Sequence, residues 1–149
     1  MKFEKYSVTS LSGVEYDKLD DKFDLPTRST SGSAGYDFHS PFDLVIKKRK
    51  TVKFPLLVKA VDMPKDMVLL ITNRSGLSLK WGVTIDNAIG VIDSDYEKCI
   101  WIQLTNHGRK TYRIKVNDKV AQGIFVRFGT VDGDTASGLR NGGFGSTGR

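Results

Sequence analysis

Residues 99–128 read CIWIQLTNHGRKTYRIKVNDKVAQGIFVRF, and this stretch decides the fold class. Apolar side chains alternate with other residues at 99–104 and with charged residues at 112–116, which is the period-two pattern of strands that bury one face. Turn-forming residues, such as those at 106–108, separate the runs at short spacing. Because an apolar run at 120–128 follows, the stretch predicts consecutive short strands.

The first half of the chain carries the same signals. Residues 52–58 and 68–72 are short apolar runs, and the turn residues Asp62 and Pro64 lie between them. A chain of 149 residues suits one domain with a core of its own. We therefore predict a single domain over residues 1–149, built as an all-β sandwich or barrel.

One segment departs from the strand pattern, namely residues 74–82, RSGLSLKWG. Ser75 can cap a short helix and Gly82 can end it, with Leu77 and Trp81 four apart on one face. The positive end of such a helix at Arg74 suits a phosphate group. We predict one helix of one or two turns among the strands.

The charge balance favours anionic partners. The chain has 23 Lys and Arg against 17 Asp and Glu, a formal net charge of +6, which suits nucleic acid or a small polyphosphate. The one dense basic run, residues 47–50, is predicted to be a solvated turn, because no aromatic residues interleave with it as they do in nucleic-acid platforms. Stable nucleic-acid binding is therefore not expected.

Compartment signals are few. No apolar run approaches the ~20 residues of a membrane span, and the N-terminus has no apolar targeting region, so no membrane partner is expected. The single cysteine, Cys99, agrees with a reducing compartment. We expect a cytoplasmic protein, with a nuclear address also open.

Five separated segments hold residue types that suit nucleotide chemistry. Each could be only a turn, a helix cap or a tail, but their order and spacing resemble the five motifs of the trimeric dUTPases, from about Leu25 to Gly148. The segments are AGYD at 34–37, RSGLS at 74–78, GVIDSDY at 90–96, NDKVAQ at 117–122 and GGFGSTG at 142–148.

The resemblance implies a fold and an assembly. The fold is an all-β, β-clip or jelly-roll-like distorted barrel with one short helix. Residues 129–149 would form a flexible glycine-rich arm that closes over the active site of a neighbouring subunit in a homotrimer. The implied reaction is hydrolysis of dUTP to dUMP and diphosphate by water attack on the α-phosphate, which limits uracil incorporation into DNA and supplies dUMP for dTMP synthesis.

The third motif would hold the nucleoside, by the same resemblance. Asp93 would be the catalytic base that activates water, as a carboxylate within hydrogen-bond reach can do. Tyr96 would pack beneath the deoxyribose and reject a 2′-hydroxyl. The uracil edge would meet the Asn87 amide and the backbone of a hairpin beginning Gly90-Val91-Ile92; unpaired buried polar groups would then reject other bases.

The other motifs would hold the triphosphate and Mg²⁺. Magnesium favours oxygen ligands, keeps several of its waters and is bound largely by substrate phosphates. The resemblance implies that Asp37 contacts it through water only. Arg140 is expected to replace the family's arginine, which usually stands one residue earlier, at Leu139. The remaining implied substrate-binding residues are Arg74, Ser75, Gly76 and Gln122, with Phe144 stacking on uracil and Gly145, Ser146 and Thr147 at the γ-phosphate.

Two departures from the family pattern and three rival functions stay open. Glu97-Lys98 follow the third motif, and Asn117 and Lys119 stand where the family usually has glycine and arginine. A dCTP deaminase would need a glutamate where this chain has Gln103. The other rivals are a non-catalytic nucleotide-binding regulatory module and a basic nucleic-acid-binding β-barrel.

Overall fold

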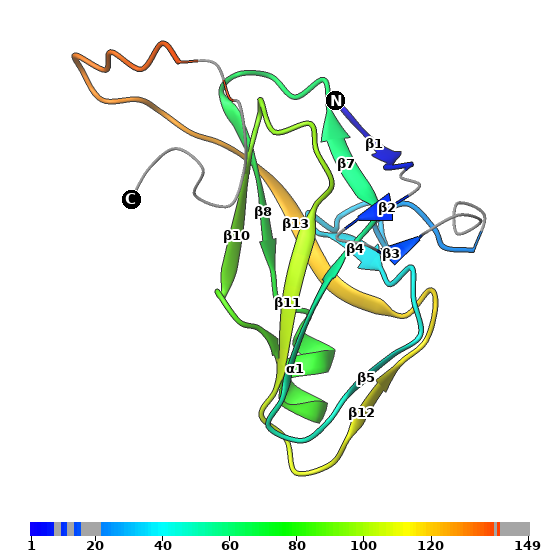
Figure 1. Ribbon diagram of the computed structural model, residues 1–149. Coiled ribbons are helices and arrows are strands. Elements are labelled where there is room, and N and C mark those ends of the chain that lie inside the picture. The colour runs from blue at the N-terminus through cyan, green and yellow to red at the C-terminus, as the bar shows by residue number, and fades with distance from the viewer. Residues whose placement is uncertain (8–9, 12–13, 16–21, 139, 141–149) are drawn as a thin grey trace.

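The computed structural model describes residues 1–7, 10–11, 14–15, 22–138 and 140 (Figure 1). Within them the chain forms thirteen strands and one helix. The elements are β1 (Lys2–Lys5), β2 (Ser10–Leu11), β3 (Val14–Glu15), β4 (Tyr36–His39), β5 (Leu44–Ile46), β6 (Thr51–Pro55), β7 (Val58–Val61), β8 (Met67–Thr72), α1 (Ser75–Trp81), β9 (Val83–Ile85), β10 (Ile89–Asp93), β11 (Trp101–Asn106), β12 (Tyr112–Ile114) and β13 (Lys119–Arg127).

The strands form small antiparallel sheets. The largest has the order β10-β8-β13-β4, and a second has the order β6-β11-β9. The pairs β1-β7, β12-β5 and β2-β3 complete the set within the described residues, where no sheet closes into a full barrel. The all-β, jelly-roll-like prediction with one short helix is confirmed, and no helix in this part of the chain has the length and apolar character to cross a membrane.

The predicted alternation places the core. In β11, Ile102, Leu104 and Asn106 are buried, while the residues between them are half-buried. The predicted run at 52–58 is split into β6 and β7, because Leu57 takes a positive φ of 52° between them. Side chains from several sheets meet in one cluster, among them Phe38, Leu56, Leu69, Leu104, Ile114 and Val120.

The helix begins one position away from the prediction. Arg74, not Ser75, occupies the N-cap position, and it makes no side-chain capping hydrogen bond. Gly82 ends the helix as predicted, with a left-handed φ of 65° that favours glycine. Leu77 is buried, but Trp81 is 55% exposed, so only the first part of the predicted apolar face packs on the core.

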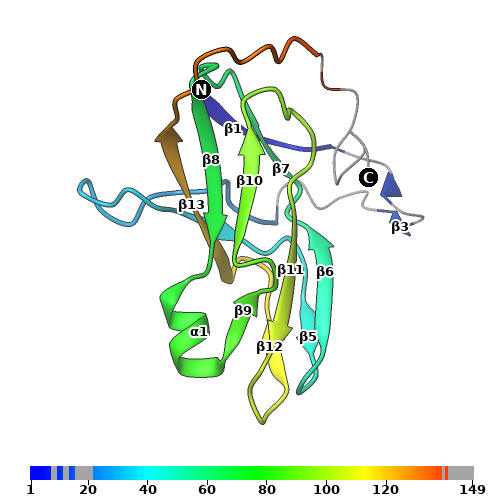
Figure 2. The same ribbon diagram turned by 90° about the vertical axis from the view of Figure 1, so that its left-hand side faces the viewer.

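The register of β8 against β10 sets the position of the later site residues. Asp93 pairs with Val68, near the start of β8, whereas Arg74 follows the other end of β8 by two residues. Six residues of extended chain from 68 to 74 span about 20 Å. Asp93 and Arg74 therefore lie at opposite ends of the sheet, as Figure 2 shows for the end of β10 and the start of α1.

A substitution at Gly123 in β13 tests how closely this sheet is packed. A Cβ there would lie 2.7 Å from Phe38 Cε2 and 2.9 Å from Leu69 Cδ1, both in buried side chains. Gly123→Ala should lower stability by about 1–3 kcal/mol through overpacking. Gly32→Ala is the control, because a Cβ at Gly32 meets nothing within 4 Å. Thermal unfolding at one fixed protein concentration measures both, and equal midpoints would contradict the packing.

Candidate functional site

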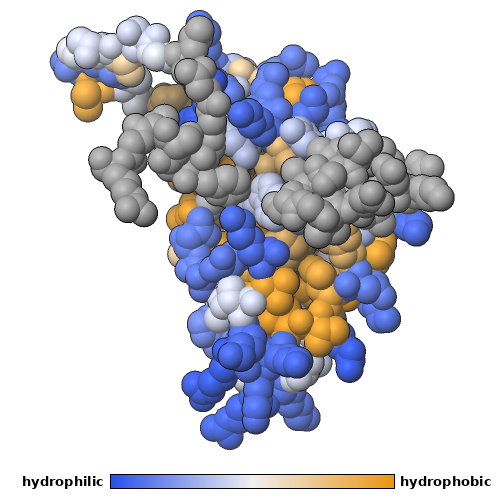
Figure 3. All heavy atoms as spheres, viewed as in Figure 1, coloured by the Kyte–Doolittle hydropathy of each residue, from blue (hydrophilic) through white to orange (hydrophobic). Residues whose placement is uncertain are grey.

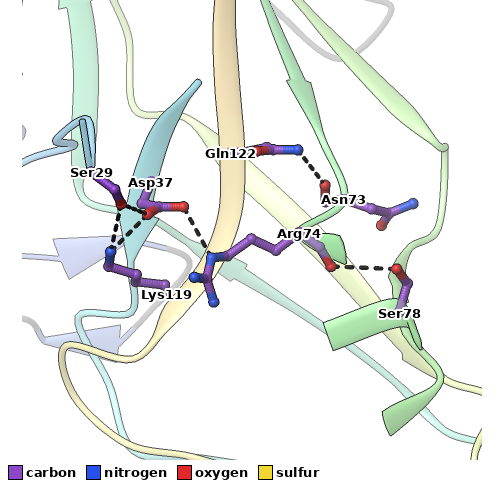
Figure 4. Close-up of polar contacts among 7 residues, drawn as sticks. All are labelled: Ser29, Asp37, Asn73, Arg74, Ser78, Lys119 and Gln122. Atoms are coloured by element: carbon purple, nitrogen blue, oxygen red, sulfur yellow. Dashed lines mark hydrogen bonds and ion pairs between the residues drawn. The ribbon is translucent and has the colours of Figure 1, made fainter. Parts of the chain in front are cut away.

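Asp37 is the centre of a cationic cluster. It lies on β4 and is 8% exposed. Arg74 Nε donates to its Oδ1 at 3.0 Å, and Lys119 Nζ donates to its Oδ2 at 2.7 Å (Figure 4). The Ser29 hydroxyl also donates to Oδ2, at 3.1 Å. Both carboxylate oxygens are therefore occupied by N–H or O–H donors from three separate segments.

These contacts determine how Asp37 ionises. Burial is the largest influence and raises its pKa, but the hydrogen bonds from Lys119 and Arg74 outweigh burial, so the net pKa is lowered. Because both oxygens of this carboxylate already accept hydrogen bonds, it is better placed to contact a metal through a water molecule than to ligate the metal directly. No cluster of three His, Cys, Asp or Glu side chains lies within the described ranges, so a Mg²⁺ here would depend on phosphate oxygens and waters.

Gln122 stands beside this cluster on β13. It pairs in register with Asp37 on one side and with Thr72 on the other. Its amide Nε2 donates to the Asn73 carbonyl at 3.0 Å. Gly35 leaves space for this amide, because a Cβ there would lie 3.1 Å from Gln122 Oε1.

A cavity of about 230 Å³ opens next to these groups, and its lining includes Arg74, Gly76 and Lys119. Ser75 is exposed at the first residue of α1. Positive side chains facing a cavity suit an anionic group. We call Asp37, Arg74, Gly76, Lys119 and Gln122 the Arg74 cluster.

The two residues that depart from the family's fourth motif, Asn117 and Lys119, still supply a left-handed turn and an ion pair. Asn117 adopts φ 70°, the left-handed conformation for which glycine is otherwise favoured. Lys119 supplies the ion pair with Asp37. Sequence reasoning missed Lys119 as a site residue, although its place in an otherwise matching motif was the signal that could have identified it.

A second cavity, of about 220 Å³, forms around β10. The Tyr96 hydroxyl donates to the Cys99 carbonyl at 2.9 Å, and burial raises the pKa of Tyr96. The segment after the turn at 94–95 makes no ladder with β10 in the described structure, so the expected hairpin is instead a strand and a turn. We call this cavity the Asp93 pocket; it is lined by Asn87, Gly90, Val91, Ile92, Asp93, Tyr96, Trp101 and Arg140.

Arg140 enters the Asp93 pocket within the same chain. Its Nε donates to Asp95 at 2.7 Å, and its Nη2 contacts Asp93. The hydrogen bond to Asp95, with the charges of both carboxylates, raises the pKa of Arg140. Its guanidinium carbon also lies 5.9 Å from the centre of the Tyr96 ring. An anion that competes for Arg140 would free Asp93.

The predicted site residues thus fall into two groups that one chain does not bring together. The third-motif residues and Arg140 share the Asp93 pocket, whereas Asp37 and Gln122 join Arg74 at the other end of β8. Phe144, Gly145, Ser146 and Thr147 lie outside the described residues.

Comparisons with known proteins agree in fold and length. The dUTPase family model matches residues 21–148. The deoxyuridine 5'-triphosphate nucleotidohydrolase of Glaesserella parasuis serovar 5 is 34% identical over 139 residues, covering 89% of this chain and 92% of that protein. The crystal structure of dUTPase from Streptococcus mutans is 31% identical with a TM-score of 0.72, covering 89% and 100% of the two chains. A phage phi11 dUTPase variant from S. aureus, described with the coordination of a structural Mg(II) ion, is 23% identical with a TM-score of 0.69, covering 83% and 95%.

The lowered pKa of Asp37 predicts that part of the free energy of unfolding depends on pH. A carboxyl whose folded pKa lies below its unfolded value of about 3.9 stabilises the fold above that pH, and the stabilisation is lost as pH falls through the folded pKa. Lys119→Met should therefore be less stable than wild type at about pH 6, with the difference shrinking toward about pH 2.

Chemical unfolding at a series of pH values measures this difference. Lys65→Met is the matched control, because Lys65 is an exposed lysine in the turn between β7 and β8. A Lys119→Met deficit that stays constant across the pH range would show that the ion pair does not set the ionisation of Asp37.

Proposed function

Because the chain belongs to the dUTPase family, it hydrolyses dUTP to dUMP and diphosphate, and we propose that each active site is built from more than one copy of the chain. The observation that supports this proposal is the separation of the Asp93 pocket from the Arg74 cluster. Groups that act on one substrate must lie within hydrogen-bond reach of it. A distance of about 20 Å along β8 prevents one chain from placing both groups around the α-phosphate.

A homotrimer satisfies this requirement. When the Asp93 pocket of one copy faces the Arg74 cluster of the next, the contact is head-to-tail, and such contacts form a ring when the rotation between copies closes. Three copies then give three equivalent sites. The number three rests on the resemblance to the trimeric dUTPases.

The Asp93 pocket holds the nucleoside and starts the reaction. Asp93 orients and deprotonates the water that attacks the α-phosphorus, and diphosphate leaves. Tyr96, fixed by its bond to the Cys99 carbonyl, packs beneath the deoxyribose. The Asn87 amide and the backbone of Gly90, Val91 and Ile92 pair with the uracil edge. A partly buried edge strand with fixed donors and acceptors penalises other bases.

The Arg74 cluster holds the triphosphate of the same substrate molecule. Arg74, Ser75 and Gly76 bind phosphate oxygens at the start of α1, Gln122 lies beside the α-phosphate, and Lys119 adds positive charge. When bound, Mg²⁺ would supply positive charge to the leaving diphosphate. Asp37 would hold the metal through its water shell, and Arg74 and Lys119 keep the Asp37 carboxylate ionised.

The C-terminal arm completes the site. Arg140 leaves Asp93 and Asp95 for the γ-phosphate, where Ser146, Thr147 and Gly145 also bind, and Phe144 stacks on uracil. Exclusion of water by the arm strengthens every charged contact inside the site. This exchange of partners links substrate binding to release of the catalytic base.

Gln103 disfavours the deaminase alternative. Its amide Nε2 donates to Asp86 at 2.7 Å, and an amide cannot shuttle the protons that attack on a cytosine ring requires. A buried free Cys99 agrees with the cytoplasmic site of action that we propose.

Substrate selectivity tests the reaction directly. With Mg²⁺ present, diphosphate release from dUTP should exceed release from UTP, dTTP or dCTP by orders of magnitude, because unpaired buried polar groups reject a wrong base by up to ~10⁴-fold. Chelation of Mg²⁺ should slow dUTP turnover. Similar rates for all four nucleotides would contradict the assignment of the Asp93 pocket.

Mixing of inactive variants tests the shared site. Arg74→Ala and Asp93→Asn homotrimers should each be nearly inactive. Trimers formed by co-refolding the two chains contain sites with two intact halves, so activity should return to on the order of a quarter of the wild-type rate.

The control pairs Asp93→Asn with Tyr96→Ala. Both substitutions damage the Asp93 pocket, so no mixed site is intact and activity should stay absent. Recovery in neither mixture would show that one chain supplies both halves.

A further inference from the structure

The end of the molecule beyond the C-terminus of α1 is built from segments that carry many basic residues. Segments 44–51, 79–84 and 105–114 meet there, through the pairing of β12 with β5 and of β11 with β9. Figure 3 shows hydrophilic residues over its lower end, where the β5–β6 and β11–β12 turns lie. We call these segments the basic tip; they contain no Asp or Glu and carry Lys47, Lys48, Arg49, Lys50, Lys80, Arg109, Lys110 and Arg113.

Asn106 holds the two basic turns of this tip in place. It is fully buried, and its Nδ2 donates to the carbonyls of Ile46 and Lys110, both at 2.9 Å. Its backbone exchanges hydrogen bonds with the turn at 47–50, from Arg49 N at 2.9 Å and to the Lys50 carbonyl at 3.0 Å. The basic side chains therefore project from an ordered platform.

Two facing glycines bring an aromatic ring to the same platform. His107 N donates to the Gly82 carbonyl at 2.8 Å, and a Cβ on Gly108 would lie only 2.6 Å from the Trp81 carbonyl oxygen. This close approach packs the end of α1 against the β11–β12 turn. Trp81 is 55% exposed, and the Tyr112 ring supports it with ring centres 5.5 Å apart.

The surface next to Trp81 is hollowed. One hollow of about 460 Å³ is lined by Trp81, Lys80, Lys110 and Tyr112 among others, and a second of about 540 Å³ is lined by Lys48, Arg49, Gly108 and Arg109. Gly108 and Arg109 line both, so the two hollows are adjacent. Residues 47–50 form an exposed turn, as predicted. Tertiary packing brings the aromatic residues Trp81 and Tyr112 to the same surface, although no aromatic residue interleaves with this run in the sequence.

We propose that the basic tip binds single-stranded nucleic acid. Basic grooves that track phosphates, with an aromatic ring on which a base stacks, are the usual means of sequence-tolerant single-strand binding. Stacking requires an exposed base face, which a duplex does not offer. A lipid surface fits less well, because α1 has only seven residues and buries Leu77 in the core. Outside the tip, acidic residues outnumber basic ones in the sequence, so the tip accounts for the net positive charge of the chain.

Fluorescence anisotropy of a labelled oligothymidine of about 16 nucleotides, a length that one domain can cover, tests the proposal on the full chain. At about 50 mM salt we expect binding that weakens steeply as salt rises. Lys48→Glu with Arg109→Glu should weaken binding at least ~10-fold and lower the salt slope by about 1.4, because two phosphate contacts are lost. Its dUTP turnover should match wild type.

Two comparisons separate a built site from general charge attraction. Lys22→Glu with Lys65→Glu makes the same change in net charge at exposed positions outside the tip, and it should bind like wild type. Trp81→Ala should weaken single-strand binding at least ~5-fold, while Trp81→Phe retains it, because a stacked base contributes ~1–3 kcal/mol.

Several results would overturn the proposal. They are the absence of oligothymidine binding at about 50 mM salt, equal affinity for a duplex of the same length, and indifference to the tip substitutions. Binding to vesicles of phosphatidylcholine with phosphatidylserine, in place of oligothymidine, would assign the tip to a membrane instead. The dUTPase assignment does not depend on these outcomes, because Lys48 and Arg109 line neither the Asp93 pocket nor the cavity beside the Arg74 cluster.

Discussion

The antiparallel register of β10 on β8 is the constraint on which the site depends. Five consecutive residue pairs, from Ile89 with Thr72 to Asp93 with Val68, fix it. A slip of one residue would turn every side chain of β10 to the opposite face. With this register, Asp93, the proposed base, and Arg74, the proposed phosphate ligand, lie at opposite ends of one sheet. The proposed reaction therefore requires assembly of several copies.

The Arg74 cluster and the Asp93 pocket differ in how their charges are paired. In the Arg74 cluster, a buried carboxylate is surrounded by two cations and a hydroxyl, so its charge is fixed before any phosphate or metal arrives. In the Asp93 pocket, the proposed base Asp93 is paired with Arg140, and we propose that a phosphate replaces this contact. In the proposed mechanism, the ion cluster around Asp37 positions the phosphates, and the Arg140–Asp93 ion pair controls the base. The family's chemistry needs little more from the protein than positioning and charge.

Local patterns in the sequence predicted much of the fold. The alternation at 99–104 and 112–116 and the run at 120–128 correspond to β11, β12 and β13, and Gly82 ends the helix as expected. The motif spacing also named most of the residues that line the Asp93 pocket, and their roles stay predictions. Local patterns report the period of a segment, however, and not its partner. The Asp37–Lys119 ion pair joins positions 82 residues apart, and the ring of Trp81 reaches the basic turns only through tertiary contacts. Strand register and such long-range pairs depend on the whole fold, so the separation of the half-sites could not be inferred from the sequence.

A structure of the assembled protein with a non-hydrolysable dUTP analogue and Mg²⁺ tests the central claim most directly. We predict that the deoxyribose contacts Asp93 and Tyr96 of one copy, while the phosphates contact Arg74 and Gln122 of another. A nucleotide that contacts Asp93 and Arg74 of the same copy would contradict the account.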